Sequence, residues 1–96
     1  MTDAEAAAGL AAAEAYEGWE AGFIGATNNA AMVSLVITTA DGGADQTSQG
    51  RQIAAAKALT TAITNAGYAD EVSGSMITAI TAAVLQAVSA LRAQRS

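Results

Sequence analysis

The spacing of apolar positions predicts an all-α protein. From Thr2 to about Thr39, apolar and small residues recur every three or four positions, which places them on one face of a helix. We therefore expect one long helix, or two collinear helices, over residues 2–39. The positions that form this stripe are Tyr16, Trp19, Phe23, Ala26, Ala30, Val33 and Ile37.

One part of this range is ambiguous. Residues 32–39 (MVSLVITT) are rich in β-branched side chains, which suit a strand as well as a helix. The helical period continues through Val33 and Ile37, and the chain offers no second strand candidate to pair with this one. We therefore expect residues 32–39 to be helical.

Two shorter helices are predicted to follow and to fold back on the first. Residues 40–50 are rich in turn residues and predict a loop, and residues 67–73 predict a turn. The intervening helices are expected at residues 51–66 and 74–94. Their apolar faces hold Ile53, Ala56, Leu59, Ala62 and Ile63 in the first and Ile77, Ile80, Val84, Ala87 and Leu91 in the second. The chain is thus predicted to form a single domain over residues 1–96.

Local signals predict where the helices begin and end. Thr2 and Glu5 have the spacing of a capping box. Gly67 follows the second helix and suits a left-handed residue there, while Asp70 or Ser73 could cap the third helix.

Composition suggests how such a chain gains stability. The hydrophobic fraction is 52%, but 27 of these residues are Ala and only 23 are larger. Small domains with little core usually add disulfides, metals or partners. Without Cys or His the first is impossible and the second has poor ligands, so we expect no metal or cofactor and favour oligomerisation.

A second face of the N-terminal helix carries compact residues, which are Gly18, Gly22, Gly25 and Asn29. Small residues at this spacing allow another helix backbone to approach closely. The alternative is a helix that kinks or breaks near residues 22–29, because each Gly costs about 1 kcal/mol relative to Ala.

Charge is divided unequally along the chain. Residues 1–45 hold seven acidic residues and no base, whereas residues 46–96 hold two acidic and four basic residues. This division fits an antiparallel hairpin or subunits that meet acidic surface to basic surface, and the alternative is a solvated acidic face. The residues concerned are Glu14, Glu17, Glu20, Arg51, Lys57, Arg92 and Arg95. Four dispersed bases on an acidic chain argue against nucleic-acid binding.

Two windows, residues 21–40 and 72–91, are free of charge and long enough to span a membrane. Their Asn, Ser, Thr and Gln residues favour burial against protein instead of lipid. The acidic N-terminal segment is unlike a secretory signal, so we expect the protein in the cytoplasm or within an assembled particle.

No catalytic constellation is present. The Ser and Thr residues have no His partner, and Glu14, Glu17 and Glu20 are better explained as an exposed acidic stripe than as a metal or acid–base site. Asp41 and Asp45 do not match a calcium loop, because Gln52 stands where that loop requires Glu. We expect the protein not to be an enzyme.

The sequence therefore predicts a structural subunit that packs Ala-, Gly- and Thr-rich helical faces into a homo-oligomer, filament, shell or particle. The alternative is a small adaptor or regulator that binds the helix of another protein through its aromatic stripe. A membrane-inserted, pilin-like subunit is a third hypothesis. The expected core or interface anchors are Tyr16, Trp19, Phe23, Val33, Ile37, Ile77, Ile80, Val84 and Leu91.

Overall fold

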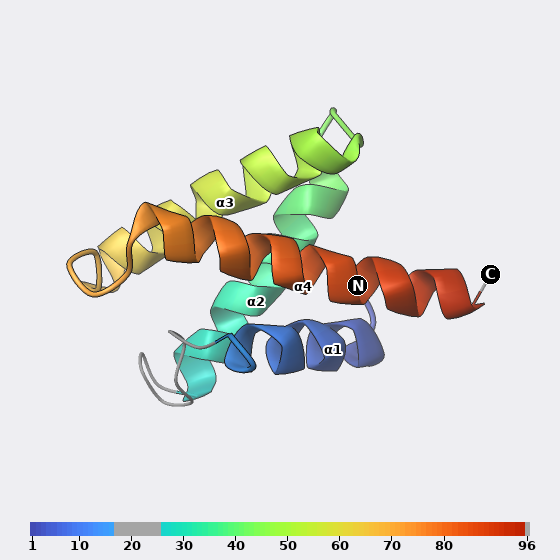
Figure 1. Cartoon of the computed structure of the whole chain (residues 1–96), viewed down its shortest axis with the longest axis horizontal. Coiled ribbons are helices and arrows are strands. Elements are labelled where there is room, and N and C mark those ends of the chain that lie inside the picture. The colour runs from blue at the N-terminus through green and yellow to red at the C-terminus, as the bar shows by residue number, and fades with distance from the viewer. Residues whose placement is uncertain (17–25, 96) are drawn as a thin grey trace.

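A computed structural model describes residues 1–16 and 26–95, apart from the side chains of residues 26 and 27. These residues form four α-helices and no strand: α1 (Asp3–Glu14), α2 (Ala26–Gly42), α3 (Ser48–Asn65) and α4 (Gly74–Arg95) (Figure 1). The all-α prediction is confirmed, and residues 32–39 are helical.

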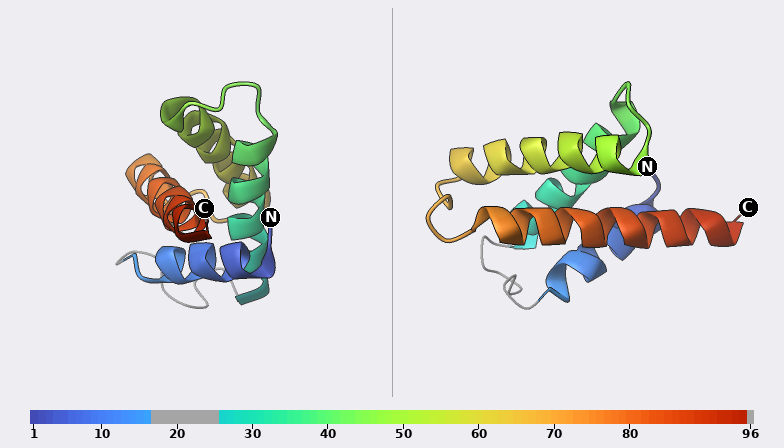
Figure 2. Two further views of the ribbon diagram at one scale, coloured as in Figure 1. Left: turned by 90° about the vertical axis from the view of Figure 1, so that its right-hand side faces the viewer. Right: turned by 45° about the horizontal axis from the view of Figure 1, so that its top comes forward.

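The predicted layout of the helices is wrong in the N-terminal part of the chain. The predicted loop over residues 40–50 is also shorter in the structure, because α2 continues to Gly42 and α3 begins at Ser48. In place of one long helix over residues 2–39 the structure has α1 and α2, which run in different directions (Figures 1 and 2). A straight helix of 38 residues would be about 57 Å long. The longest extent of the molecule is only 39 Å, so such a helix could not pack along its whole length. The longest helix is instead α4, with 22 residues.

The helices form two layers. α3 and α4 lie side by side and run in opposite directions, and α2 crosses behind them (Figures 1 and 2). α1 packs mainly against α4, and α2 packs mainly against α3. As a result α4 lies between α1 and α3 and contacts every other helix.

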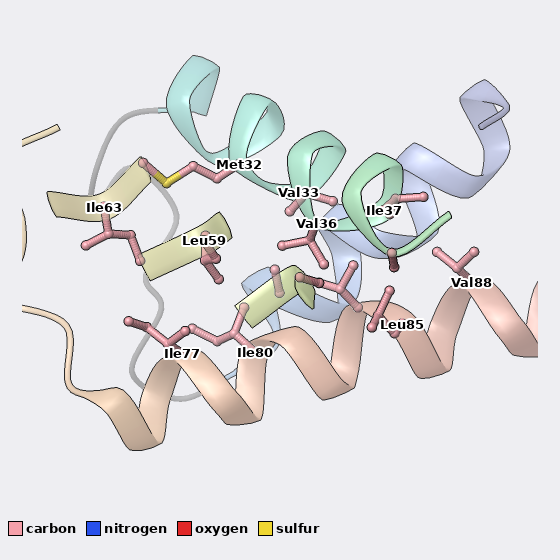
Figure 3. Close-up of a cluster of buried hydrophobic side chains, with 14 of the residues drawn as sticks. Met32, Val33, Val36, Ile37, Leu59, Ile63, Ile77, Ile80, Leu85 and Val88 are labelled. Carbon is pink, nitrogen blue, oxygen red and sulfur yellow. The ribbon is translucent and has the colours of Figure 1, made fainter. Parts of the chain in front are cut away.

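The core lies where α2, α3 and α4 meet (Figure 3). Its centre is made of β-branched and leucine side chains that are almost completely buried, including Ile37, Leu59, Ile63, Ile80 and Val84. This core is continuous within one chain. Burial of these side chains therefore does not itself require an oligomer.

Three local signals at helix ends were predicted correctly, whereas the N-cap of α3, Thr47, was not predicted. Thr2 and Glu5 form the full capping box of α1. Ser73, not Asp70, caps α4, because its Oγ accepts the backbone N–H of Met76 at 3.2 Å. Gly67 adopts a positive φ of 87°, as predicted.

Two apolar positions were assigned to the wrong face. Ile53 is 59% exposed, and Ala55 takes its place in the core of α3. Ala30 is exposed on α2, whereas Asn29 beside it is fully buried. The buried face of α2 is thus rotated by one residue at its N-terminal end.

Candidate functional site

Charged side chains from all four helices meet where α1 begins and α4 ends. Arg92 is the centre of this cluster: its Nε donates to Glu5 Oε2 at 2.6 Å, and its two Nη groups donate to Asp41 at 3.0 and 2.9 Å. Arg95 adds a second contact to Glu5 Oε2 at 2.6 Å. Arg51 Nη1 also contacts Asp41 Oδ1, at 3.0 Å. We call these five residues the ionic clasp.

The position of Glu5 follows from the local sequence. Its Oε1 accepts the backbone N–H of Thr2 at 2.8 Å, which orients the carboxylate at the start of α1. The residue is 4% exposed, and the hydrogen bond from Arg92 is the largest cause that lowers its pKa well below the ordinary value of 4.5. Glu5 is therefore a buried carboxylate that remains charged near neutral pH.

Asp41 is held in the last turn of α2 by two bases. Hydrogen bonds from Arg92 and Arg51 lower its pKa against the opposing effect of desolvation. The loop after α2 supports this geometry, because Gln46 accepts from Arg51 at 2.8 Å and donates to the carbonyl oxygens of Ala40 and Gly43 at 2.9 and 2.8 Å.

The ionic clasp contains three of the seven predicted electrostatic residues. Arg51, Arg92 and Arg95 bind acidic residues of the first half of the same chain, as a folded-back hairpin requires. Lys57 and Glu14 are exposed and enter no ion pair within the described ranges. Glu17 and Glu20 lie outside the residues that the structure describes.

Close helix packing occurs at Gly9, a residue that sequence reasoning missed. A Cβ atom at Gly9 would lie 3.0 Å from Val33 Cγ1, 3.1 Å from Ile37 Cδ1 and 3.2 Å from Val84 Cγ1. Gly9 thus lets α1 approach both α2 and α4. The available signal was a single Gly in the middle of an Ala-rich helix, four residues after the buried Glu5.

Of the predicted small-residue face, only Asn29 can be placed, since Gly18, Gly22 and Gly25 lie outside the described residues. Asn29 is fully buried on α2, and neither atom of its amide has a hydrogen-bond partner among the described residues. The same is true of Thr81 Oγ1 on α4. Buried polar groups without partners cost stability.

The predicted core or interface anchors fall into three groups: buried, half-buried, and outside the described residues. Val33, Ile37, Ile77, Ile80 and Val84 are buried. Tyr16 and Leu91 are half-buried, and Tyr16 packs against the core. Trp19 and Phe23 lie outside the described residues.

An open apolar groove runs between α2 and α3. It has a volume of about 480 Å³. Leu35 lies on the α2 side, and the α3 side presents small residues around a single base. These α3 residues are Ala54, Lys57, Ala58, Thr61, Ala62 and Asn65. The groove therefore combines an apolar floor with one positive charge.

Two further hollows lie between α3 and α4. One, of about 470 Å³, has the exposed Ile53 at its edge beside Ala56 and Thr78. The other, of about 430 Å³, is more polar, and its only charged side chain is Arg51, which already belongs to the ionic clasp. Neither brings together an acid, a base and a nucleophile.

One helix in the described part of the chain, α4, is long and apolar enough to cross a membrane. A third of that window is buried inside the protein, and the core helix of a soluble protein meets the same criterion.

Comparison of the chain with protein families, with curated protein sequences and with solved structures finds no match.

Proposed function

We propose that this protein is a non-enzymatic structural subunit that assembles with copies of itself through the outer face of α3. The α2–α3 groove is the observation that carries the proposal. It is open, its floor is apolar, and no described segment of the chain covers it. Helices pack closely against small side chains, which is the kind of surface that α3 presents there.

The distribution of charged residues supports an acidic partner surface opposite this groove. Lys57 at its edge has no acidic partner among the described residues, whereas the other three bases belong to the ionic clasp. Asp3, Glu14, Asp70 and Glu71 are exposed and enter no ion pair with a described residue. An acidic surface of a second copy would complement Lys57, and the chain has such surfaces in excess.

This complementarity favours a head-to-tail contact. The groove with Lys57 on one copy and an acidic surface on the next are different patches, so the contact is heterologous. Heterologous contacts close into rings or extend into filaments. The partner is thus another copy of this chain, and repetition of one contact builds the assembly.

Size-exclusion chromatography with light scattering, over a range of concentrations and salt, tests the proposal. We expect species larger than the 9.5 kDa chain that grow with concentration and shrink at high salt. The variant K57E should weaken assembly, and the matched control K57R should preserve it. A 9.5 kDa monomer at every concentration would refute self-assembly and would favour a different partner helix for the groove.

A further inference from the structure

The polar hollow between α3 and α4 lies where the buried face of α3 becomes polar. Farther along the helix that face consists of Ala55, Leu59 and Ile63. Gln52 precedes Ala55 by three residues and Ser48 precedes Gln52 by four, so both belong to the same face. An amide and a hydroxyl thus stand where apolar side chains would close the core, and a hollow of about 430 Å³ remains between the two helices.

Both helices contribute polar side chains to this hollow. Gln52 and Ser48 come from α3, and Gln86 and Ser89 come from α4. None of these four side chains makes a hydrogen bond with another described residue. The hollow therefore offers amide and hydroxyl groups from two sides to a molecule that enters it.

Arg51 is bound through only one of its three guanidinium nitrogens. Its Nη1 donates to Gln46 at 2.8 Å and to the carbonyl oxygen of Ala40 at 3.4 Å, and it contacts Asp41 at 3.0 Å. Nε and Nη2 have no partner among the described residues, and both are accessible to solvent. These two nitrogens share one edge of the guanidinium, and such an edge binds a carboxylate through two parallel hydrogen bonds.

The charges around Arg51 favour an anionic ligand. The ionic clasp combines three arginines with two carboxylates, which leaves one net positive charge. Among the described residues that line the hollow, Arg51 is the only charged one. Asp45, beside the lining residue Gln46, instead accepts from the N–H and Oγ1 of Thr47 at 3.0 and 2.7 Å. No described carboxylate therefore occupies the open edge of Arg51.

We propose that this hollow binds a small hydroxylated carboxylic acid. The carboxylate accepts hydrogen bonds from Nε and Nη2 of Arg51, and the hydroxyls bond to the amides of Gln52 and Gln86. The volume lies within the range of about 300–1,000 Å³ that is usual for small-molecule sites. An acid with a purely apolar chain is disfavoured, because it would leave these amides without partners. The site shares no residue with the α2–α3 groove, so the proposal does not depend on self-assembly.

Titration with gluconate, followed by nuclear magnetic resonance of isotope-labelled protein, tests the site. Gluconate carries one carboxylate and a hydroxylated chain, whereas sorbitol lacks the carboxylate and hexanoate lacks the hydroxyls. We expect gluconate to shift the side-chain amide signals of Gln52 and Gln86 and the Nε–H signal of Arg51, with saturation. The amide of Gln94, which is exposed near the end of α4, should not shift. Each analogue should bind about tenfold more weakly, because it lacks one set of hydrogen bonds.

The contrary results of this titration are distinct. No shift of these signals at tens of millimolar gluconate would overturn the site. Equal binding of hexanoate would overturn the choice of a hydroxylated acid. Shifts of the same signals when the protein alone is concentrated would mean that an acidic side chain of another copy fills the hollow, which would overturn a small-molecule ligand.

Two variants test the residues that carry the proposal. R51K keeps a positive charge beside Asp41 but lacks the two-nitrogen edge, so it should weaken gluconate binding by about tenfold. Because Arg51 belongs to the ionic clasp, circular dichroism must confirm that R51K is folded. Unchanged binding by folded R51K would overturn the role of this edge.

Q86E provides a test that leaves the ionic clasp intact. A carboxylate at this position either repels the ligand or occupies Arg51 itself, so gluconate binding should be lost. The matched control is Q94E, which makes the same change of charge on α4 outside the hollow and should bind like the parent. Equal losses in Q86E and Q94E would show that gluconate responds only to net charge, and this result would overturn the site.

Discussion

Arg92 Nε donates a hydrogen bond to Glu5 Oε2 at 2.6 Å and so connects the first turn of α1 with the last turn of α4, 87 residues later. The contact pairs a base of the second half of the chain with an acidic residue of the first half. Through Asp41 the same arginine also reaches α2.

The clasp predicts a loss of stability in acid. The pKa values of Glu5 and Asp41 are lowered from 4.5 and 3.8 in the folded protein. A carboxyl whose pKa is lowered by folding contributes stability that is fully present above its unfolded pKa and lost as the pH falls through its folded pKa. We expect this contribution to be constant above about pH 5 and to decline steadily below it.

Urea unfolding followed by circular dichroism from pH 7 to pH 3 measures this decline. E5Q should be less stable than the parent at pH 7 and should show a shallower loss in acid. E14Q, at an exposed carboxyl of the same helix, is the control and should retain the parent profile. A parent-like profile for E5Q would contradict the role given to the clasp.

Enlarging Gly9 should displace α1. A Val side chain would collide with Val33, Ile37 and Val84, which already lie 3.0 to 3.2 Å from the position of Cβ. We expect G9V to lower the free energy of unfolding by about 3 kcal/mol. The control is G42A, where nothing lies within 4 Å, and it should raise that free energy by up to about 1 kcal/mol. Equal effects of the two changes would refute close packing at Gly9.

Replacing a buried hydroxyl should stabilise the protein. Thr81 Oγ1 is buried and has no partner among the described residues, and Val has nearly the same shape. We expect T81V to raise the free energy of unfolding by about 1 kcal/mol. T78V, at an exposed position of the same helix, should change it by less than about 0.5 kcal/mol. Destabilisation by T81V would mean that the hydroxyl has a partner in solution.

Substitutions at two residues of α3 should separate an effect on stability from an effect on assembly. Leu59 is 1% exposed, so L59A should cost about 2–5 kcal/mol of stability. Ile53 is 59% exposed, so I53A should leave thermal unfolding of the monomer nearly unchanged. Ile53 lies one helical turn before Lys57, and both side chains are exposed on the same face of α3. If this face belongs to the contact surface, I53A should reduce assembly in light scattering. A large loss of monomer stability in I53A would show that its side chain is buried in solution.

Local patterns were enough to predict the helical class and several helix ends. The capping box of Thr2 and Glu5, the cap at Ser73 and the left-handed Gly67 each depend on residues only a few positions apart. Such signals are readable in sequence because their energies are local. Residues 32–39 were assigned correctly by their period, despite their β-branched side chains.

The ion-pair partners and the burial of side chains at the candidate site were harder to predict. The partner of Glu5 lies 87 residues away, and no short-range pattern distinguishes Arg92 from the other bases. The exposure of Ile53 and the burial of Asn29 depend on how each helix is rotated against its neighbours. Sequence reasoning therefore emphasised Gly18, Gly22 and Gly25 and passed over Gly9, although each of the four is a Gly within a predicted helix.

By itself the sequence determined that the chain is helical and, to within three residues, where α3 and α4 begin and end. For the acidic and basic halves it predicted either attraction or a solvated acidic face. Only the tertiary structure decided that α1 and α2 are separate helices, that α1 packs closely against α2 and α4 at Gly9, and that Arg92 joins Glu5 to Asp41. The reason is that helix formation depends on neighbours within a turn. The direction of a helix and the partners of its side chains are instead set by the packing of segments distant in sequence.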